Sequence, residues 1–292
     1  MNSLRQVEEE RQKSRATFTW RFRRNKLAIV GLTVVSICLF IAAFANFLAP
    51  TGYDVGDLVD ARQNPSWAHI FGTDAVGRDY FSRILYATRT SILVAGGVSA
   101  ITFTVGITLG TLGGYLGGWV DQVVVRIIEI ATGIPTLLVA MFLMGFLGHD
   151  LHNVILALGM SGWVVETRIT RGQFLAFRER EFVIAAQAIG ASRLRVCLRH
   201  IFPNIIPILA VLLAFQIPAV IFAEAGLSFL GLGIDEPVPS LGKMVSTSLD
   251  YVRVYWHMGL FPSLMIAIIT MGFTFMGDGL RDALDPTMNR ES

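Results

Sequence analysis

Long apolar runs alternate with polar stretches along this chain. A bilayer core about 30 Å thick requires about 20 apolar residues in helical form. Five runs meet this requirement well, whereas the fourth run along the chain is short enough to be a re-entrant or buried helix instead. The six runs are Leu27–Leu48, Ser91–Leu112, Ile128–Leu147, Leu151–Val165, Ile205–Ala223 and Met258–Met276. The pattern predicts an all-α membrane protein.

The placement of lysine and arginine argues that the short fourth run also crosses. Cytoplasmic loops of membrane proteins carry an excess of these two residues. With six crossings and a cytoplasmic N-terminus, the inside segments carry 8, 1, 7 and 2 of the 24 Lys and Arg residues, and the outside segments carry 6. Without the fourth crossing, the arginines from Arg168 to Arg199 move outside. We therefore predict six transmembrane helices with both ends of the chain in the cytoplasm.

Composition supports this class of protein. Hydrophobic residues make up 53% of the 292 residues and charged residues 16%, against about 25% charged residues in soluble domains. The net charge of +2 gives no reason to expect a nucleic-acid partner. The first apolar run lacks a small-residue cleavage site, so we interpret it as a retained helix rather than a signal peptide.

The first 26 residues form a polar, basic tail. Phe18, Trp20 and Phe22 lie among arginines there. Aromatic and basic side chains together are typical of a segment at the depth of the lipid headgroups. An interfacial helix and a solvated tail that only sets orientation are both open.

Residues 181–204, EFVIAAQAIGASRLRVCLRHIFPN, form a basic segment between two apolar runs. Apolar residues recur twice at helical spacing, which predicts two short amphipathic helices. Gly190 suits the C-terminus of the first helix, Ser192 can cap the second, and Pro203 comes where the second is expected to end. The two apolar faces are Phe182, Ala185, Ala186 and Ile189, and then Leu194, Cys197, Leu198 and Ile201.

The side chains of this segment suit contact with another surface. Several alanines leave little bulk, so a partner can approach the backbone closely. Glu181 opens the first helix, where a carboxylate is favoured by the helix dipole. Arg193, Arg195 and Arg199 can pair with acidic groups of a partner or with lipid phosphates. The alternative is that the segment packs only on its own bundle, with the arginines enforcing topology.

The segment resembles the EAA loop of the membrane subunits of ATP-binding cassette (ABC) importers, since E, AA and G are followed by HIFPN. Four further motifs resemble the second permease subunit of the dipeptide/oligopeptide/nickel class, and the resemblance runs from about Arg23 to Pro286. Phe182 departs from the alanine that is frequent at its position in the motif. The four motifs are FGTDAVGRDYFSRILYATRTS (Phe71–Ser91), GWVVETRITRG (Gly162–Gly172), GLSFLGLG (Gly226–Gly233) and MGDGLRDALDP (Met276–Pro286).

The resemblance implies a type I importer permease fold, with residues 27–286 as the permease domain and 287–292 as a cytoplasmic tail. It implies a bacterial or archaeal cytoplasmic membrane and a peptide cargo. It also implies four partner subunits: a second permease, two ATP-binding subunits and an extracytoplasmic binding protein. The residues expected to couple to the ATPase are Glu181, Phe182, Ala185, Ala186, Gly190, Ala191, Ser192, Arg193, Arg199, His200 and Pro203.

No nucleotide site is expected in this chain. A P-loop requires G-x-x-x-x-G-K-[ST], and Gly242-Lys243 is followed by Met244. ATP and Mg²⁺ are therefore assigned to the partners, and no cofactor or metal to this chain. Within the family, a nickel or metal-chelate cargo stays open. An ion-coupled carrier, suggested by Glu129, Glu166 and Glu224, and an intramembrane enzyme are the other classes considered.

Charged residues near the apolar runs have ordinary structural interpretations as well. Arg126 and Glu129 are spaced to pair on one helix face. Glu166 is expected at the membrane interface, and Glu224 either faces the transport path or ends its helix in water. In the loops, His149 and His152 are weak candidates for a metal site, and Asp74 and Asp79 are expected to cap turns and meet Arg78 or Arg83.

Overall fold

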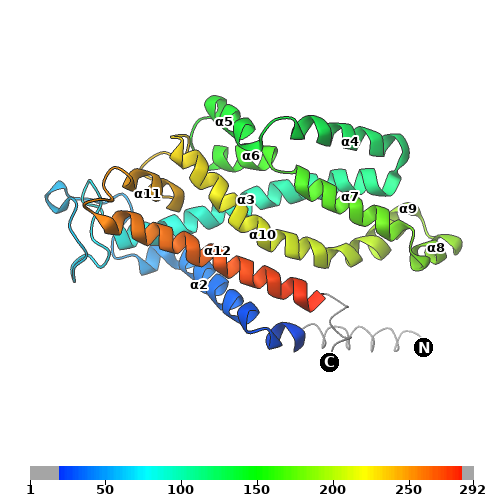
Figure 1. Cartoon of the computed structure of the whole chain (residues 1–292), viewed down its shortest axis with the longest axis horizontal. Coiled ribbons are helices and arrows are strands. Elements are labelled where there is room, and N and C mark those ends of the chain that lie inside the picture. The colour runs from blue at the N-terminus through cyan, green and yellow to red at the C-terminus, as the bar shows by residue number, and fades with distance from the viewer. Residues whose placement is uncertain (1–19, 285–292) are drawn as a thin grey trace.

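The computed structural model describes residues 20–284, so Phe18 and the predicted tail 287–292 lie outside the described residues. Four helices are long and apolar enough to cross a membrane, and five segments qualify if one bent helix pair is a single span. In the described part the ordered elements are helices, joined by loops with two isolated β-bridges. The four long helices are α2 (Lys26–Leu48), α3 (Tyr80–Thr111), α10 (Phe202–Phe229) and α12 (Trp256–Leu284), shown in Figure 1.

The long helices extend beyond the apolar runs that predict them. Asn25 caps α2, and residues 20–24 before it are helical. Asp79 accepts a hydrogen bond from the Ser82 amide, so α3 begins at Tyr80 rather than at Ser91. Hydropathy marks the stretch of a helix that sits in an apolar environment, whereas the cap marks where the helix begins.

The predicted third span, Ile128–Leu147, is not one continuous helix. It divides into α4 (Gly118–Thr132) and α5 (Thr136–Leu147), which are bent by 79° relative to each other. Pro135 lies in the break, where its ring disfavours a helical conformation of the preceding residue. The proline signal was present in the sequence, but it lay within an unbroken apolar run.

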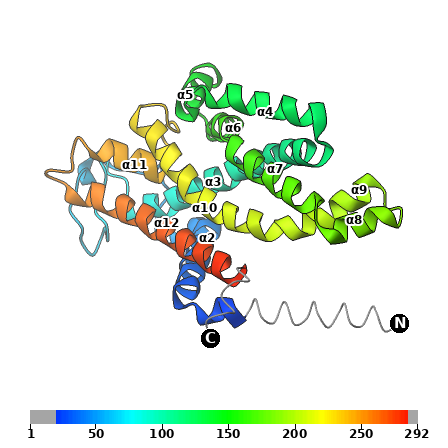
Figure 2. The same ribbon diagram turned by 45° about the vertical axis from the view of Figure 1, so that its right-hand side comes forward.

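The predicted fourth span divides into α6 (Leu151–Ser161) and α7 (Val164–Arg178), with Gly162 between them. Both helices pack along α3, one after the other, and Figure 2 shows them from a second side. Three glycines spaced four residues apart, Gly106, Gly110 and Gly114, lie against α7. A Cβ on Gly106 would lie 2.4 Å from the Glu166 Cβ, so a larger residue does not fit there. Small residues at this spacing are what close membrane helix pairs use.

The two ends of the bundle differ in what they carry. The N-terminal part of α3, the loop 49–79 and α11 (Leu241–Ser248) lie at one end, and α8 (Glu181–Ala188) and α9 (Arg193–Arg195) lie at the other in both Figure 1 and Figure 2. A hydrogen bond of 2.9 Å from the Asn25 side chain to Asp282 joins the beginning of α2 to the end of α12.

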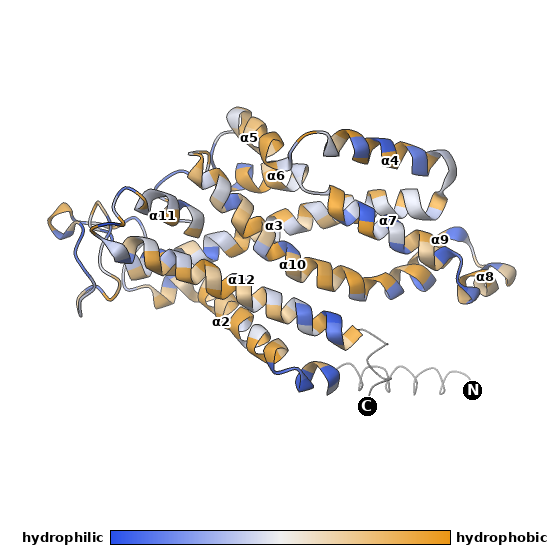
Figure 3. Ribbon diagram, viewed as in Figure 1, coloured by the Kyte–Doolittle hydropathy of each residue, from blue (hydrophilic) through white to orange (hydrophobic). Residues whose placement is uncertain are grey.

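The apolar surface of the bundle is unusually open. Figure 3 shows apolar residues along α2 and α10 and polar residues between α8 and α9. Large apolar side chains face outward along the helices, for example Phe40, Ile130 and Phe146. Soluble proteins rarely expose so many large apolar side chains together, so this surface fits contact with lipid or with other membrane subunits.

Candidate functional site

The first helix of the predicted EAA-like segment forms as expected but buries a different face. α8 spans Glu181–Ala188. Its buried side chains are Val183 and Ala186, whereas Phe182 is 41% and Ile189 87% exposed. The buried pair joins an apolar cluster with Phe174, Val196, Ile201 and Ile205. Of the predicted apolar face of Phe182, Ala185, Ala186 and Ile189, only Ala186 is buried, and the other three residues lie on the outer surface.

Gly190 ends α8 as predicted. Its φ is +84°, a left-handed conformation that glycine adopts without steric cost. The Gly190 amide donates to the Gln187 carbonyl, and the Ala191 amide donates to the Ala186 carbonyl, each at 3.0 Å. These two bonds make a Schellman cap, which satisfies carbonyls at the end of the helix. The turn is thus fixed by backbone hydrogen bonds rather than by side-chain contacts.

The second predicted helix is shorter and less regular than expected. Ser192 caps it by accepting from the Arg195 amide, but α9 contains only Arg193–Arg195 before a π-helical turn over Val196–Ile201. Cys197 and Ile201 are buried, whereas Leu194 and Leu198 are exposed. Pro203 does not end the second helix. It lies in the first turn of α10, where its missing amide hydrogen costs no helical bond.

One side-chain hydrogen bond joins the segment to a neighbouring element, and a second lies within the segment. The Tyr115 hydroxyl, in the π-helical turn Leu112–Leu116 that follows α3, donates to the Arg193 carbonyl at 2.7 Å. The Asn204 amide donates to the His200 carbonyl at 2.6 Å. Together with the buried apolar cluster, these bonds hold α8 and α9 as a fixed part of the bundle end.

The outward surface combines apolar, small and basic groups. Glu181 and Ala185 are exposed on α8. A hollow of about 310 Å³ is lined by Ile189, Gly190, Ala191, Arg195, Arg199 and His200. A second hollow of about 330 Å³ includes Arg178, Glu179 and Arg193. Such a surface suits a partner that offers a shallow groove and acidic side chains.

Protein covers the Glu166 side chain completely. It is 0% exposed in α7, and neither of its carboxylate oxygens has a hydrogen-bond partner among the described residues. Arg171, five residues further along α7, forms a bidentate ion pair with Asp121 of α4. The Glu166 side chain lies where α7 meets Gly106, so the close packing of these helices covers it.

Two other predicted carboxylates have defined partners. Glu224 is 1% exposed and accepts hydrogen bonds from Ser228 at 2.9 Å and Ser240 at 2.7 Å, so it does not end its helix in water. The predicted pair of Arg126 and Glu129 forms at 2.7 Å on the exposed face of α4.

The loop residues behave largely as predicted. Asp79 caps α3, and Asp74 binds the Arg78 side chain at 2.6 Å. His149 lies 3.7 Å from Asp235. Within residues 20–284, no group of three or more His, Cys, Asp or Glu side chains is arranged to hold a metal ion.

Two features were missed by sequence reasoning. The glycines at 106, 110 and 114 carry a signal in their regular spacing, which is typical of close helix packing. Glu236 contacts both Arg78 and Arg83, although more than 150 residues separate it from either in the chain. No local pattern in the sequence predicts a contact between residues so far apart.

Comparisons with known proteins place these features among transport components. Residues 106–290 match the family described as binding-protein-dependent transport system inner membrane component. Residues 16–66 match the N-terminal TM domain of oligopeptide transport permease C.

Two proteins of Bacillus subtilis are among the similar sequences. The oligopeptide transport system permease protein OppC is 38% identical over 271 residues, which cover 92% of this chain and 88% of OppC. The dipeptide transport system permease protein DppC is 39% identical over 271 residues, which cover 92% of this chain and 85% of DppC.

A relative from Escherichia coli and a solved structure extend the comparison. The probable D,D-dipeptide transport system permease protein DdpC of Escherichia coli is 36% identical, with 93% of this chain and 91% of DdpC covered. A chain in a structure of the MetNI methionine ABC transporter, described as inward facing, has a TM-score of 0.57 and 16% identity. That match covers 70% of this chain and 97% of the other, and it shows a shared fold.

Proposed function

Because this chain belongs to the family of binding-protein-dependent transport system inner membrane components, we propose that it is a permease subunit of an ABC importer for di- or oligopeptides. The names of the similar proteins, an oligopeptide and a dipeptide permease, support the cargo. The observation that carries the mechanism is the segment 181–204 at one end of the bundle, which is packed on the bundle by one face and exposes the other.

The chain crosses the membrane six times in this proposal. Support comes from the way α6 and α7 follow α3: Ile155 lies against Gly97, Gly159 against Ile101, and Phe174 against Gly114. The two shorter helices thus run parallel to α3 over the same depth. If α3 crosses, α6 and α7 together cross as well, and α4 with α5 supplies the return.

Both ends of the chain and the segment 181–204 lie in the cytoplasm in this proposal. Arginines are dense from Arg168 to Arg199, as expected for an inside segment. Loop 49–79 and α11 then lie outside, at the opposite end of the bundle.

The segment 181–204 docks on a separate ATP-binding subunit. Its exposed surface supplies the contacts, and its buried cluster and Schellman cap supply stiffness. A displacement of the docked subunit is therefore conveyed to α10, which continues directly from the segment. The residues assigned to this contact and its support are Glu181, Phe182, Ala185, Ala186, Gly190, Ala191, Ser192, Arg193, Arg199, His200 and Pro203.

The energy for transport comes from partners. The sequence contains no G-x-x-x-x-G-K-[ST] motif, so we assign ATP and Mg²⁺ to two ATP-binding subunits. A second permease subunit and an extracytoplasmic binding protein complete the importer. Binding and release of nucleotide shift the permease pair between two conformations that open to opposite sides of the membrane.

Reconstitution of the complex with its partners in liposomes tests this proposal. The double variant Glu181→Lys and Gly190→Pro is expected to insert normally but to lose ATP-driven uptake of a tripeptide and peptide-stimulated ATPase activity. Proline cannot adopt a positive φ and has no amide hydrogen for the Gln187 carbonyl. Glu181→Lys alone separates the lost charge from the altered turn.

Gly172→Ala provides the control, because an added Cβ there meets no atom within 4 Å. Uptake and ATPase activity that stay unchanged in the double variant would show that segment 181–204 does not couple transport. Uptake driven by an ion gradient without ATP would instead favour a secondary carrier.

A further inference from the structure

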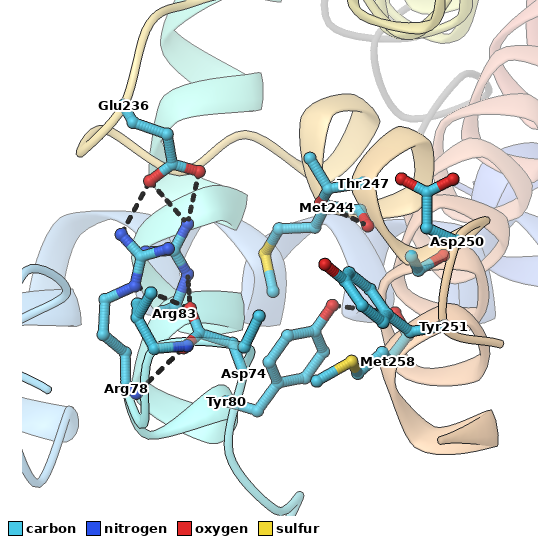
Figure 4. Close-up of a pocket in the computed structure, with 13 residues that line it drawn as sticks. Asp74, Arg78, Tyr80, Arg83, Glu236, Met244, Thr247, Asp250, Tyr251 and Met258 are labelled. Atoms are coloured by element: carbon cyan, nitrogen blue, oxygen red, sulfur yellow. Dashed lines mark hydrogen bonds and ion pairs between the residues drawn. The ribbon is translucent and has the colours of Figure 1, made fainter. Parts of the chain in front are cut away.

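A cavity of about 440 Å³ lies at the end of the bundle opposite segment 181–204. It is formed by the start of α3, the loop before α11, and the segment between α11 and α12 (Figure 4). Pockets of roughly 300–1,000 Å³ are the size that holds small molecules in proteins. The coupling mechanism makes no use of this cavity.

Two arginines form one side of the cavity. Arg78 Nη1 lies 2.6 Å from Glu236 Oε2, and Arg83 Nη2 lies 3.3 Å from Glu236 Oε1. Both guanidinium groups also approach Asp74, with Nε to Oδ2 distances of 2.6 Å for Arg78 and 3.6 Å for Arg83. Figure 4 shows Glu236 on the two arginines from the side opposite Asp74. Two adjacent guanidinium groups form a strong binding site for a carboxylate.

The two carboxylates bound to these guanidinium groups, Asp74 and Glu236, are held very differently. Asp74 also accepts hydrogen bonds from the amides of Val76 and Arg78, both at 2.9 Å, and its side chain is 10% exposed. The Glu236 side chain is 43% exposed and, within the described part of the chain, the arginines are its hydrogen-bond partners. Asp74 is therefore a permanent part of the turn, whereas Glu236 is a partner that another carboxylate can replace.

The charges of Arg78, Arg83 and Asp74 also favour the exchange of Glu236 for another carboxylate. Arg78 and Arg83 carry two positive charges and Asp74 carries one negative charge, so one charge is left for Glu236 to neutralise. Burial lowers the pKa of Arg78, but its hydrogen bonds to Asp74 and Glu236 raise the pKa further, and the guanidinium stays charged. A ligand carboxylate in place of Glu236 preserves this balance.

The rest of the cavity offers an apolar floor and one further carboxylate. Its floor is apolar, with Tyr80, Met244 and Met258 all buried. The Tyr80 hydroxyl already donates to the Met258 carbonyl at 2.7 Å, so it requires nothing from a ligand. Asp250 lines the far side in Figure 4, and it is exposed, with no ion-pair partner in residues 20–284.

We propose that this cavity binds a short peptide as a zwitterion: the terminal carboxylate displaces Glu236 from Arg78 and Arg83, and the terminal ammonium faces Asp250. The apolar floor then contacts the side chains between the two termini. Glu236 acts as an internal stand-in for the ligand, and its release frees the loop before α11 from the start of α3. The inference rests on the proposed function in its choice of a peptide.

Binding of L-alanyl-L-alanine to the purified complex, without binding protein and without nucleotide, tests the site. Its C-terminal amide and its N-acetyl derivative each remove one terminal charge, and isothermal titration compares the three. We expect each derivative to bind about tenfold more weakly, because one charge-assisted contact is lost. Alanine and tri-alanine, measured in the same way, distinguish an amino-acid site from a peptide site.

Variants give the sharper result. Glu236→Gln is expected to tighten binding of L-alanyl-L-alanine several-fold, since the internal competitor loses its charge. Asp250→Asn is expected to weaken it and to abolish the preference over the N-acetyl derivative. Asp235→Asn is the control, because this neighbouring carboxylate is exposed and does not line the cavity.

Equal binding of the three dipeptide probes, or weaker binding to Glu236→Gln, overturns the site. Either result with ATP-driven uptake intact leaves the permease function standing. Tight, charge-dependent binding without any ATP-driven uptake would confirm the site and contradict the importer.

Discussion

The two ends of the bundle differ in the contacts that hold their outermost segments. At the end that carries α8, apolar packing of Val183, Ala186 and Ile201 and a backbone cap at Gly190 hold the segment. At the opposite end, Leu241 and Met244 are also buried, but the loops are joined by charged side chains, with Glu236 bonded to Arg78 and Arg83. Apolar packing transmits displacement because its contacts cannot slide without opening cavities. Ion pairs partly exposed to water exchange partners at little cost. The first end is thus suited to passing on motion, and the second to releasing a contact.

The largest effect is expected from separating the helices that connect the two ends of the bundle. Gly106→Leu places a branched side chain where even a Cβ would lie 2.4 Å from the Glu166 Cβ. We expect α3 and α7 to part, so that little folded complex is recovered after detergent extraction. Gly96→Leu on the same helix is the control, because an added Cβ there meets nothing within 4 Å. Equal recovery of the two variants would show that the glycine contact is not needed.

At the apolar end, Ile201→Ala removes a fully buried side chain from the cluster. The resulting cavity is expected to lower the free energy of unfolding by about 3 kcal/mol. Thermal unfolding of the complex in detergent measures the loss, with Ile206→Ala, at an exposed position, as the control. The difference should be the same in low and high salt, and a loss that disappears in high salt would contradict apolar packing.

At the charged end, Arg83→Met leaves Asp74 and Glu236 with one guanidinium group between them. Arg83 is 3% exposed, so we expect a loss of about 2 kcal/mol in stability, less than for a fully buried pair because Glu236 is open to water. Unlike the loss at the apolar end, this one should shrink as salt rises. Arg89→Met, which removes a hydrogen bond to Asn46, is the comparison variant. No change in Arg83→Met would mean that the network does not stabilise the loops.

The smallest effect is expected for Glu236→Gln. Its partly exposed ion pairs should contribute less than about 1 kcal/mol, so the midpoint of thermal unfolding should fall only slightly. A loss as large as that of Arg83→Met would show that Glu236 is a fixed structural residue, and the distinction between the two ends would fail.

The long helices could be predicted from hydropathy, but their limits could not. α3 continues from Ser91 back to Tyr80 because Asp79 caps it, although Arg83 and Arg89 keep the apolar run from extending that far. The break between α4 and α5 follows from Pro135, which a count of apolar residues ignores.

In the candidate site, too, some features could be predicted from the sequence and others could not. The turn at Gly190 and the cap at Ser192 were predicted because each depends on one local residue. The packing face of α8 was not, because apolar residues occur on both sides of the helix and periodicity alone cannot say which side has a neighbour. Contacts such as that of Glu236 with Arg83 depend on the whole tertiary arrangement, so no window of sequence contains them.

The left-handed turn at position 190 also has a genetic consequence. Every amino acid that one base change can substitute for glycine carries a Cβ, and at a φ of +84° such a residue costs roughly 1 kcal/mol or more in backbone strain. Asparagine, which tolerates this conformation best among the others, is out of reach of a single base change. Spontaneous mutants selected on a toxic peptide should therefore include changes in this codon, even though the added side chain would meet no neighbouring atom.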